Sequence, residues 1–193
     1  KINTMKKLLL ILLCVPLIGF SQQTYVPDNN FEQELINLGY DNLLDDYVTT
    51  ANIDTVNHLY VSNLNIADLT GIEDFTYLSL LYCVNNQLTT LDVSNNTYLV
   101  EFDCSENQLT SLDVRNGNNT NMGFWDGWLN LGIGTVNNPN LTCINVDDST
   151  FSANNWGYGI STWFEIDTQH YFSNNCSAAT IYGCTDSLAC NYD

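Results

Sequence analysis

The stretch Leu78-Ser-Leu-Leu-Tyr-Cys-Val-Asn-Asn-Gln-Leu-Thr-Thr-Leu91 decides the fold, because it recurs 21 residues later as Leu99-Val-Glu-Phe-Asp-Cys-Ser-Glu-Asn-Gln-Leu-Thr-Ser-Leu112. In both copies apolar residues occupy the first, fourth, eleventh and fourteenth positions, Cys the sixth and Asn the ninth. The apolar fourth and sixth positions predict a short strand, and the Asn predicts a turn whose backbone groups its amide satisfies. One such coil cannot bury its own apolar face, so the pattern predicts a solenoid of stacked coils.

The same pattern extends to both sides of this stretch. Val56-x-x-Leu59-x-Val61 stands 22 residues before the first copy, and Leu141-x-x-Ile144-x-Val146 stands 42 residues, or two periods, after the second. Between them, Met122-x-x-Trp125-x-Gly127 is the best candidate for a fourth strand, while the Gly- and Asn-rich residues 132–140 predict a loop.

These lines predict four to five coils over residues 56–151. We expect Leu81, Phe102 and Ile144 to share one interior, and Tyr60 and Tyr82 to face outward, because alternate side chains of a strand point to opposite sides.

The repeat resembles the leucine-rich repeat, and its flanks resemble secreted bacterial, internalin-like members of that family. Val26-Pro-Asp-Asn-Asn-Phe-Glu and Leu38-Gly-Tyr-Asp resemble their helical N-terminal cap, and Asn138-Pro-Asn-Leu-Thr-Cys143 resembles their closing coil. The resemblance implies an α/β solenoid with parallel strands, an N-terminal helical cap over residues 24–55 and a C-terminal cap over residues 152–178. It also implies protein–protein interaction and display on the cell surface.

The N-terminal cap carries its own helix signals. Asp28 or Asn29 is suited to the N-cap position and Gly39 to the stop. Phe31, Leu35 and Leu38 are spaced to share one helix face.

The two ends of the chain lie outside the repeats. From Met5, two Lys precede the apolar run Leu8–Leu13, which predicts a secretory leader over residues 1–22, cleaved near Ser21–Gln23. The run is too short to span a bilayer, so we expect no membrane insertion once the leader is removed. Residues 179–193 resemble the start of a Cys-bounded Gly-Cys-Thr-Asp…Asn-Tyr-Asp module, which implies a longer surface protein.

The charge is strongly acidic. The chain has 22 Asp and Glu against four Lys and Arg, with a net charge of −18. Three of the four basic residues lie within the first seven positions, so only Arg115 remains basic after the leader. Such a surface repels phosphate backbones, which excludes nucleic-acid binding and favours a basic partner.

Seven Cys are present. Cys83 and Cys104 take an inward strand position, which favours small core side chains. Cys143 and Cys176 flank the C-terminal cap in an oxidising compartment, so we expect a disulfide that pins it. Cys184 and Cys190 pair with each other or with partners beyond residue 193.

No catalytic motif is present in the sequence. His58 and His170 form no metal spacing, and there is no nucleophile elbow, phosphate loop or dinucleotide fingerprint. We therefore predict a protein that is not an enzyme and needs no cofactor. Calcium is the one ion that the acidic composition suggests, with weak candidate ligands in Asp186, Asn191 and Asp193.

Function then falls to the outward positions of the strands, which stack in columns from coil to coil. Aromatic residues beside charges are typical anchors of interfaces. The candidate partner-binding residues are Tyr60, Leu80, Tyr82, Val84, Glu101, Asp103, Glu106, Asn145 and Asp147.

Several interpretations stay open for this surface. The main hypothesis is an extracellular adhesion module that holds a protein on its concave face, and a merely soluble sheet face is the plain alternative. A second hypothesis is a spacer or self-assembling subunit of a surface fibre. A weaker third is glycan binding through Trp125, Trp128, Trp156 and Trp163.

Overall fold

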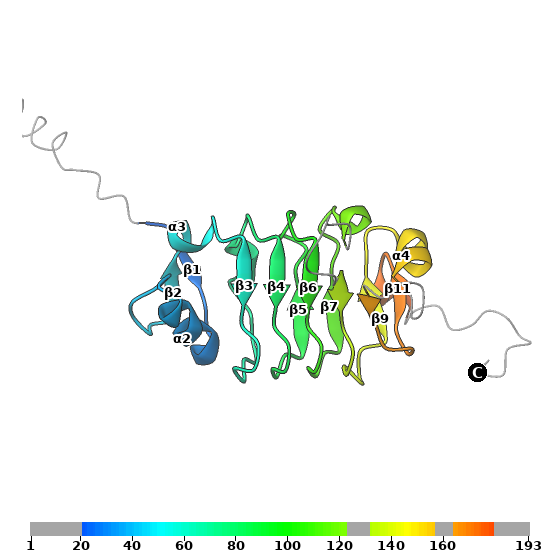
Figure 1. The fold of residues 1–193 in the computed structure, drawn as a ribbon, viewed down its shortest axis with the longest axis horizontal. Coiled ribbons are helices and arrows are strands. Elements are labelled where there is room, and N and C mark those ends of the chain that lie inside the picture. Colours follow the sequence, from blue (N-terminus) through cyan, green and yellow to red (C-terminus); the bar gives the residue numbers. More distant parts are fainter. Residues whose placement is uncertain (1–20, 123–131, 157–163, 180–193) are drawn as a thin grey trace, which may run out of the picture.

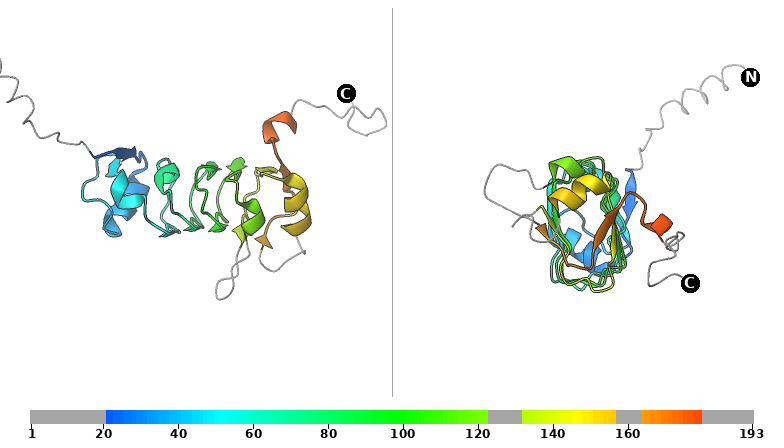
Figure 2. Two further views of the ribbon diagram at one scale, coloured as in Figure 1. Left: turned by 90° about the horizontal axis from the view of Figure 1, so that it is seen from above. Right: turned by 90° about the vertical axis from the view of Figure 1, so that its right-hand side faces the viewer.

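A computed structural model describes residues 21–122, 132–156 and 164–179 of the 193-residue chain. Short strands and turns wind into coils that follow one another along the long axis of the molecule (Figure 1). Seen along that axis, the coils superimpose on one oval outline (Figure 2). The repeat in the sequence is therefore a repeat in space, as the stacking of coils requires.

The first sheet has five parallel strands, in the order β10-β8-β6-β4-β3. Its strands are β3 (His58–Tyr60), β4 (Leu80–Tyr82), β6 (Glu101–Asp103), β8 (Ile133–Gly134) and β10 (Phe164–Glu165). Leu59, Leu81, Phe102 and Ile133 align across them. All four are buried, so the residue at this position of each strand points inward.

The second sheet has four parallel strands, in the order β11-β9-β7-β5. They are β5 (Thr90–Asp92), β7 (Ser111–Asp113), β9 (Cys143–Asn145) and β11 (Tyr171–Ser173). Leu91, Leu112 and Ile144 align here and are buried. The first coil contributes only β3, and each later coil contributes one strand to each sheet. The apolar core lies between the two sheets.

The prediction for the fourth coil is wrong. Its strand in the first sheet is β8, inside the segment predicted to be a loop, and not the line that begins at Met122. Met122 follows the 3-10 helix η2 (Asn119–Asn121) and is buried, while Trp125 and Gly127 lie outside the described residues. Ile144 does share the core with Leu81 and Phe102, as predicted, but it enters from the second sheet.

Three Asn residues hold the coils together at the turn after the first sheet. Asn86 accepts from the N–H groups of Leu64 and Ile66, and donates to the carbonyls of Val61 and Cys83. One and two coils later, Asn107 and Asn138 each accept from one N–H group, of Leu88 and of Leu109, and donate to carbonyls of their own and the preceding coil. Because all three amides are buried, they replace water for backbone groups that the turns leave unpaired.

The N-terminal end carries α2 (Asn29–Asn37), α3 (Thr50–Ile53) and an antiparallel pair, β1 (Gln23–Tyr25) with β2 (Tyr47–Thr49). Asp28 caps α2 by accepting from the N–H groups of Asn30 and Phe31 through Oδ1. Its Oδ2 accepts from Ala67 and Asp68 in the first coil, which ties the helix to the solenoid. Phe31 and Leu35 are buried as predicted, whereas Leu38 is exposed because the helix has already ended there.

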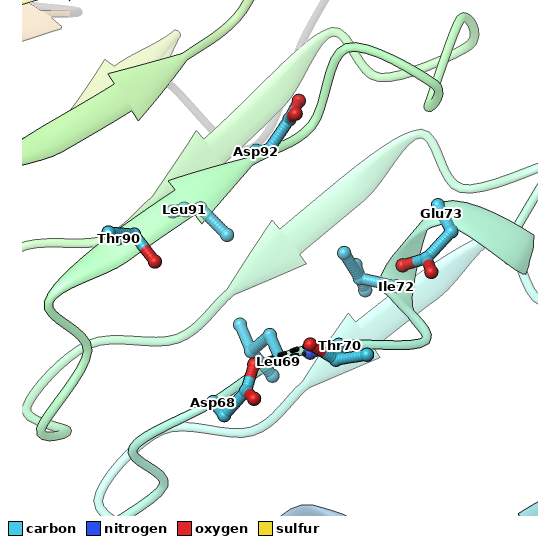
Figure 3. A pocket seen from close by; sticks show the side chains of 8 residues that line it. All are labelled: Asp68, Leu69, Thr70, Ile72, Glu73, Thr90, Leu91 and Asp92. Atoms are coloured by element: carbon cyan, nitrogen blue, oxygen red, sulfur yellow. Dashed lines mark hydrogen bonds between the residues drawn. The ribbon is translucent and has the colours of Figure 1, made fainter. Parts of the chain in front are cut away.

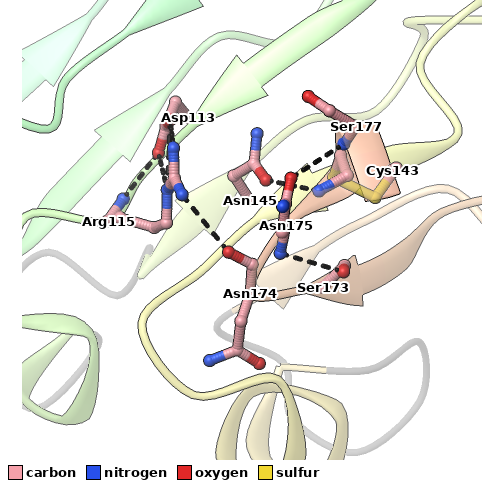
Figure 4. Close-up of a disulfide and its surroundings, with 9 residues drawn as sticks. Asp113, Arg115, Cys143, Asn145, Ser173, Asn174, Asn175 and Ser177 are labelled. Atoms are coloured by element: carbon pink, nitrogen blue, oxygen red, sulfur yellow. Dashed lines mark hydrogen bonds and ion pairs between the residues drawn. A yellow bond between two sulfur atoms is a disulfide. The ribbon is translucent and has the colours of Figure 1, made fainter. Parts of the chain in front are cut away.

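The C-terminal end carries α4 (Ser149–Asn155) and α5 (Cys176–Ala179), and the turn between the first two coils carries the 3-10 helix η1 (Ile72–Asp74). Asp148 caps α4, and Trp156 at its end is fully buried against Phe172. A disulfide joins Cys143 of β9 to Cys176 of α5, the pair that the sequence predicts (Figure 4). Within the described ranges, no helix combines the length and apolar composition needed to cross a bilayer.

Candidate interaction surface

The structure divides the predicted partner-binding residues between two sheets. Tyr60, Leu80, Tyr82, Glu101 and Asp103 lie on strands of the first sheet, and Val84 and Glu106 lie in the turns that follow β4 and β6. Asn145 and Asp147 lie on and after β9, in the second sheet. The repeat pattern predicts Asn145 in one column with Tyr82, and Asp147 in one column with Val84. This prediction is wrong, because β9 aligns with β7 and not with β6.

The residues on the first sheet differ in exposure. Tyr60 is 53% exposed, Glu106 is exposed, and Tyr82 and Val84 are half-buried. Leu80 is only 2% exposed, Glu101 4% and Asp103 8%, so the expected apolar patch at Leu80 is closed. The accessible part of this face is therefore centred on Tyr60 and Tyr82.

The two tyrosines form a stacked pair. Their rings are nearly parallel, at 5°, with centroids 5.6 Å apart, because the strand register places Tyr60 directly beside Tyr82. Since β3 is the last strand of the sheet, no further strand lies over the other face of Tyr60. The pair thus presents one supported aromatic side chain to solvent.

Glu101 fixes the second ring of the pair. The Tyr82 hydroxyl donates a hydrogen bond to the Glu101 carboxylate, which lies one strand further along the sheet. Burial, followed by this bond and by the charges of Glu101 and Asp103, raises the pKa of Tyr82 well above its usual value. Tyr82 is therefore a protonated, immobilised support for Tyr60.

Asp103 lies between the sheet surface and the thiols of the core. Its Oδ1 accepts from the N–H of Ser105 at 2.9 Å, and a Cβ added to Gly134 of β8 would lie 2.3 Å from that oxygen. Only glycine leaves room for the carboxylate at this position. Burial raises the pKa of the Cys83 and Cys104 thiols, and the charge of Asp103 raises it further. Both cysteines are free and buried, so they are core side chains, as predicted.

The outer face of the second sheet is also acidic. Asp92 and Asp113 occupy equivalent positions on β5 and β7, and Asn145 follows on β9. Arg115 pairs with the Asp113 carboxylate and donates to the Asn174 carbonyl at 3.2 Å (Figure 4). Arg115, the one Lys or Arg after the first seven positions of the sequence, is therefore paired with a carboxylate of the same chain.

A small cavity of about 140 Å³ opens beside β5, at the edge of the second sheet (Figure 3). Two of its carboxylates form hydrogen bonds within the turn to which they belong. Asp68 accepts from the N–H and hydroxyl of Thr70, and Glu73 accepts from the N–H of Gly71. The lining residues are Asp68, Leu69, Thr70, Ile72, Glu73, Thr90, Leu91 and Asp92. We assign no ligand to this cavity.

The described part of the chain contains no group of three or more His, Cys, Asp or Glu side chains arranged to hold a metal ion. The predicted calcium ligands Asp186, Asn191 and Asp193 lie outside the described residues. Of the tryptophans proposed as a glycan platform, Trp156 is in the core, and Trp125, Trp128 and Trp163 fall outside the described ranges.

A second tyrosine stack lies in the turns that precede the first-sheet strands. Tyr77 and Tyr98 are 54% and 56% exposed, their rings are 9° from parallel, and their centroids are 5.3 Å apart. Neither tyrosine is among the residues predicted from the sequence, because both lie outside the strand positions. The signal was present in Thr-Tyr-Leu at 76–78 and again at 97–99, at the same 21-residue spacing.

No protein-family model matches the chain. Internalin J of Listeria monocytogenes serotype 4b (strain F2365) is 38% identical over 72 residues. That match covers 37% of this chain but only 8% of internalin J.

Two similar solved structures are also internalins of Listeria monocytogenes. The functional domain of InlJ, described as including a cysteine ladder, has 24% identity and a TM-score of 0.43, with 65% of this chain and 38% of that chain covered. Internalin C2 of strain 4b F2365 has 18% identity and a TM-score of 0.40, with 84% and 95% covered.

Proposed function

We propose that this chain, an internalin-like leucine-rich-repeat protein, is secreted to the bacterial cell surface and binds a protein partner there. The binding face is the outer side of the first sheet, with Tyr60 as its anchor. In this proposal residues 24–55 and 152–178 are the end caps of the solenoid, and the role is recognition, not catalysis.

The Tyr60–Tyr82–Glu101 arrangement carries the proposal. A half-exposed aromatic ring contributes most to the binding free energy when it loses little conformational entropy on binding. Tyr60 is restrained by its stack on Tyr82, and Tyr82 in turn by its hydrogen bond to Glu101. Rigid, amphipathic aromatics of this kind are enriched among residues that dominate binding energy.

The charge of the face supports a basic partner. Glu106 is exposed in the turn after β6, and Glu101 and Asp103 lie on β6, next to the strand of Tyr82. Arg115, on the other sheet, is paired with Asp113 and offers no competing positive charge. A basic surface on the partner would be attracted to this face, and the attraction would weaken with salt.

Site-specific crosslinking tests the proposal. A photoreactive phenylalanine analogue replaces Tyr60 in one variant and Tyr171, an exposed tyrosine of the second sheet, in a matched control. After exposure to intact surface proteins, we expect adducts from position 60 that decline as salt is raised, and none from position 171.

Two outcomes contradict the proposal. Equal adducts at both positions mean that the first sheet is not the binding face. Adducts formed only between copies of this chain favour the alternative role, a self-assembling subunit of a surface fibre.

A further inference from the structure

The turns that carry Tyr77 and Tyr98 form a second surface, separate from the outer face of the first sheet. They lie at the upper rim of the coils, where the chain passes from the second sheet to the first (Figure 1). Tyr77 precedes β4 and Tyr98 precedes β6 by the same number of residues, so the two rings occupy one position in consecutive coils.

Buried Asn side chains hold these turns rigidly together. Asn96 donates to the carbonyls of Ile72 and Phe75 in the preceding turn, at 2.8 and 3.2 Å. Asn116 donates to the carbonyls of Asn96 and Leu99 in the same way, at 3.1 and 3.2 Å. The three successive turns are thus linked side by side, and the residues they expose are held in a fixed row.

Two of the three turns in this row are uncharged, whereas the turn that carries Tyr77 also contains the exposed Glu73 and the half-buried Asp74. Residues 94–98 and 116–121 include no Asp, Glu, Lys or Arg, although the chain as a whole carries a net charge of −18. The exposed side chains are hydroxyls and amides beside the two rings: Asn95, Thr97, Thr120 and Asn121. The acidic residues of the preceding turn are engaged elsewhere, Glu73 with Gly71 and Asp74 with Thr24.

The geometry of the stack leaves ring surface open. Parallel rings in full face-to-face contact would be separated by about 3.5–4.0 Å. The observed centroid separation of 5.3 Å is larger, so the rings are not in full face-to-face contact, and each is more than half exposed. Part of each face therefore stays accessible, with donors and acceptors on either side.

We propose that this rim, formed by Tyr77, Tyr98, Asn95, Thr97, Thr120 and Asn121, binds a neutral oligosaccharide. A sugar ring has an apolar C–H face that packs on an aromatic ring and hydroxyls that bond to amide and hydroxyl side chains. An uncharged glycan needs no ionic partner, which matches the absence of charge in residues 94–98 and 116–121. An extended chain could contact consecutive coils at once, because they repeat along one row.

The proposal is tested with the purified chain on an array that holds neutral hexose and N-acetylhexosamine oligosaccharides together with sialylated and sulfated ones. The strongest binder is then titrated by calorimetry against Tyr98→Leu, Tyr98→Phe and Tyr60→Leu. Loss of ring stacking in Tyr98→Leu should weaken binding about tenfold, whereas Tyr98→Phe, which keeps the ring, and Tyr60→Leu, on the other surface, should retain it.

Three results would overturn the proposal: no binding to any neutral glycan, binding confined to sialylated or sulfated glycans, or equal binding by Tyr98→Leu and the parent chain. Tyr60 and Tyr98 are exposed, so none of the three substitutions should unfold the chain. Circular dichroism and melting temperature of each variant check this. A failure here leaves the protein-binding proposal intact, because that proposal depends on Tyr60.

Discussion

Replacement of Asn107 by Ala should remove a large share of the stability of the solenoid. The Asn107 Oδ1 accepts from the N–H of Leu88 at 3.0 Å, and its Nδ2 donates to the carbonyls of Cys83, Cys104 and Ser105 at 3.0, 3.0 and 3.2 Å. The side chain is buried, so water cannot replace it without entering the core. The amide has two hydrogens, so one of the three donations is shared. Three full bonds at about 1 kcal/mol each correspond to a loss of about 3 kcal/mol.

Urea denaturation followed by circular dichroism measures this loss, with the disulfide kept oxidised. Gln108→Ala is the matched control, because Gln108 is the adjacent residue in the same turn and is exposed. We expect the control to change the free energy of unfolding by no more than about 0.5 kcal/mol. A loss below about 1 kcal/mol for Asn107→Ala would refute the reasoning, since the ladder of buried Asn side chains (Asn86, Asn107 and Asn138) would then contribute no more to stability than a surface side chain.

Three further predictions concern other parts of the molecule. The double variant Cys143→Ala, Cys176→Ala should lower the free energy of unfolding by about 4 kcal/mol, because the disulfide closes a loop of 33 residues and so restricts the unfolded chain. In a urea titration, the stability of this variant should not depend on reductant. Gly134→Ala should cost about 1–3 kcal/mol by overpacking against Asp103, and Asp103→Ala in the same chain should recover part of it; independent, additive losses would contradict this contact. Burial lowers the pKa of His170 below its usual value, so the unfolded chain binds more protons than the folded chain below about pH 6.5. Stability should therefore fall as the pH decreases through that range. The fall should be weaker in His170→Gln, and identical pH profiles of melting temperature for the variant and the parent chain would contradict this prediction.

The sequence was sufficient to predict the two regular coils, because each carries apolar residues at both strand positions and the Asn between them. Leu78–Leu91 and Leu99–Leu112 could be aligned without ambiguity, and the structure places them as consecutive coils.

The following coil could not be read in the same way. Leu99-x-x-Phe102 precedes the ladder Asn and Leu109-x-x-Leu112 follows it, yet both have the same spacing. An isolated Leu141-x-x-Ile144 therefore fits either sheet. Asn138 was the distinguishing signal: as the next Asn of the ladder, it places everything after it in the second sheet.

The candidate surface was predicted in outline and not in detail. Strand alternation correctly gives the outward direction of Tyr60 and Tyr82, but it carries no information on what lies above each outward position. Leu80, Glu101 and Asp103 point away from the core between the sheets and are nevertheless buried. Exposure at an outward position depends on tertiary contacts, which the repeat pattern does not encode.

The scarcity of basic residues has a consequence for the resistance of the protein to proteolysis. Trypsin-like proteases cut after Lys or Arg, and beyond the first seven positions the sequence offers them only the peptide bond after Arg115. The Arg115 side chain forms an ion pair with the Asp113 carboxylate and a hydrogen bond to the Asn174 carbonyl. Both interactions must break before it can enter the specificity pocket of such a protease. Acidity and this single pinned arginine together make the solenoid a poor substrate for a whole class of digestive enzymes.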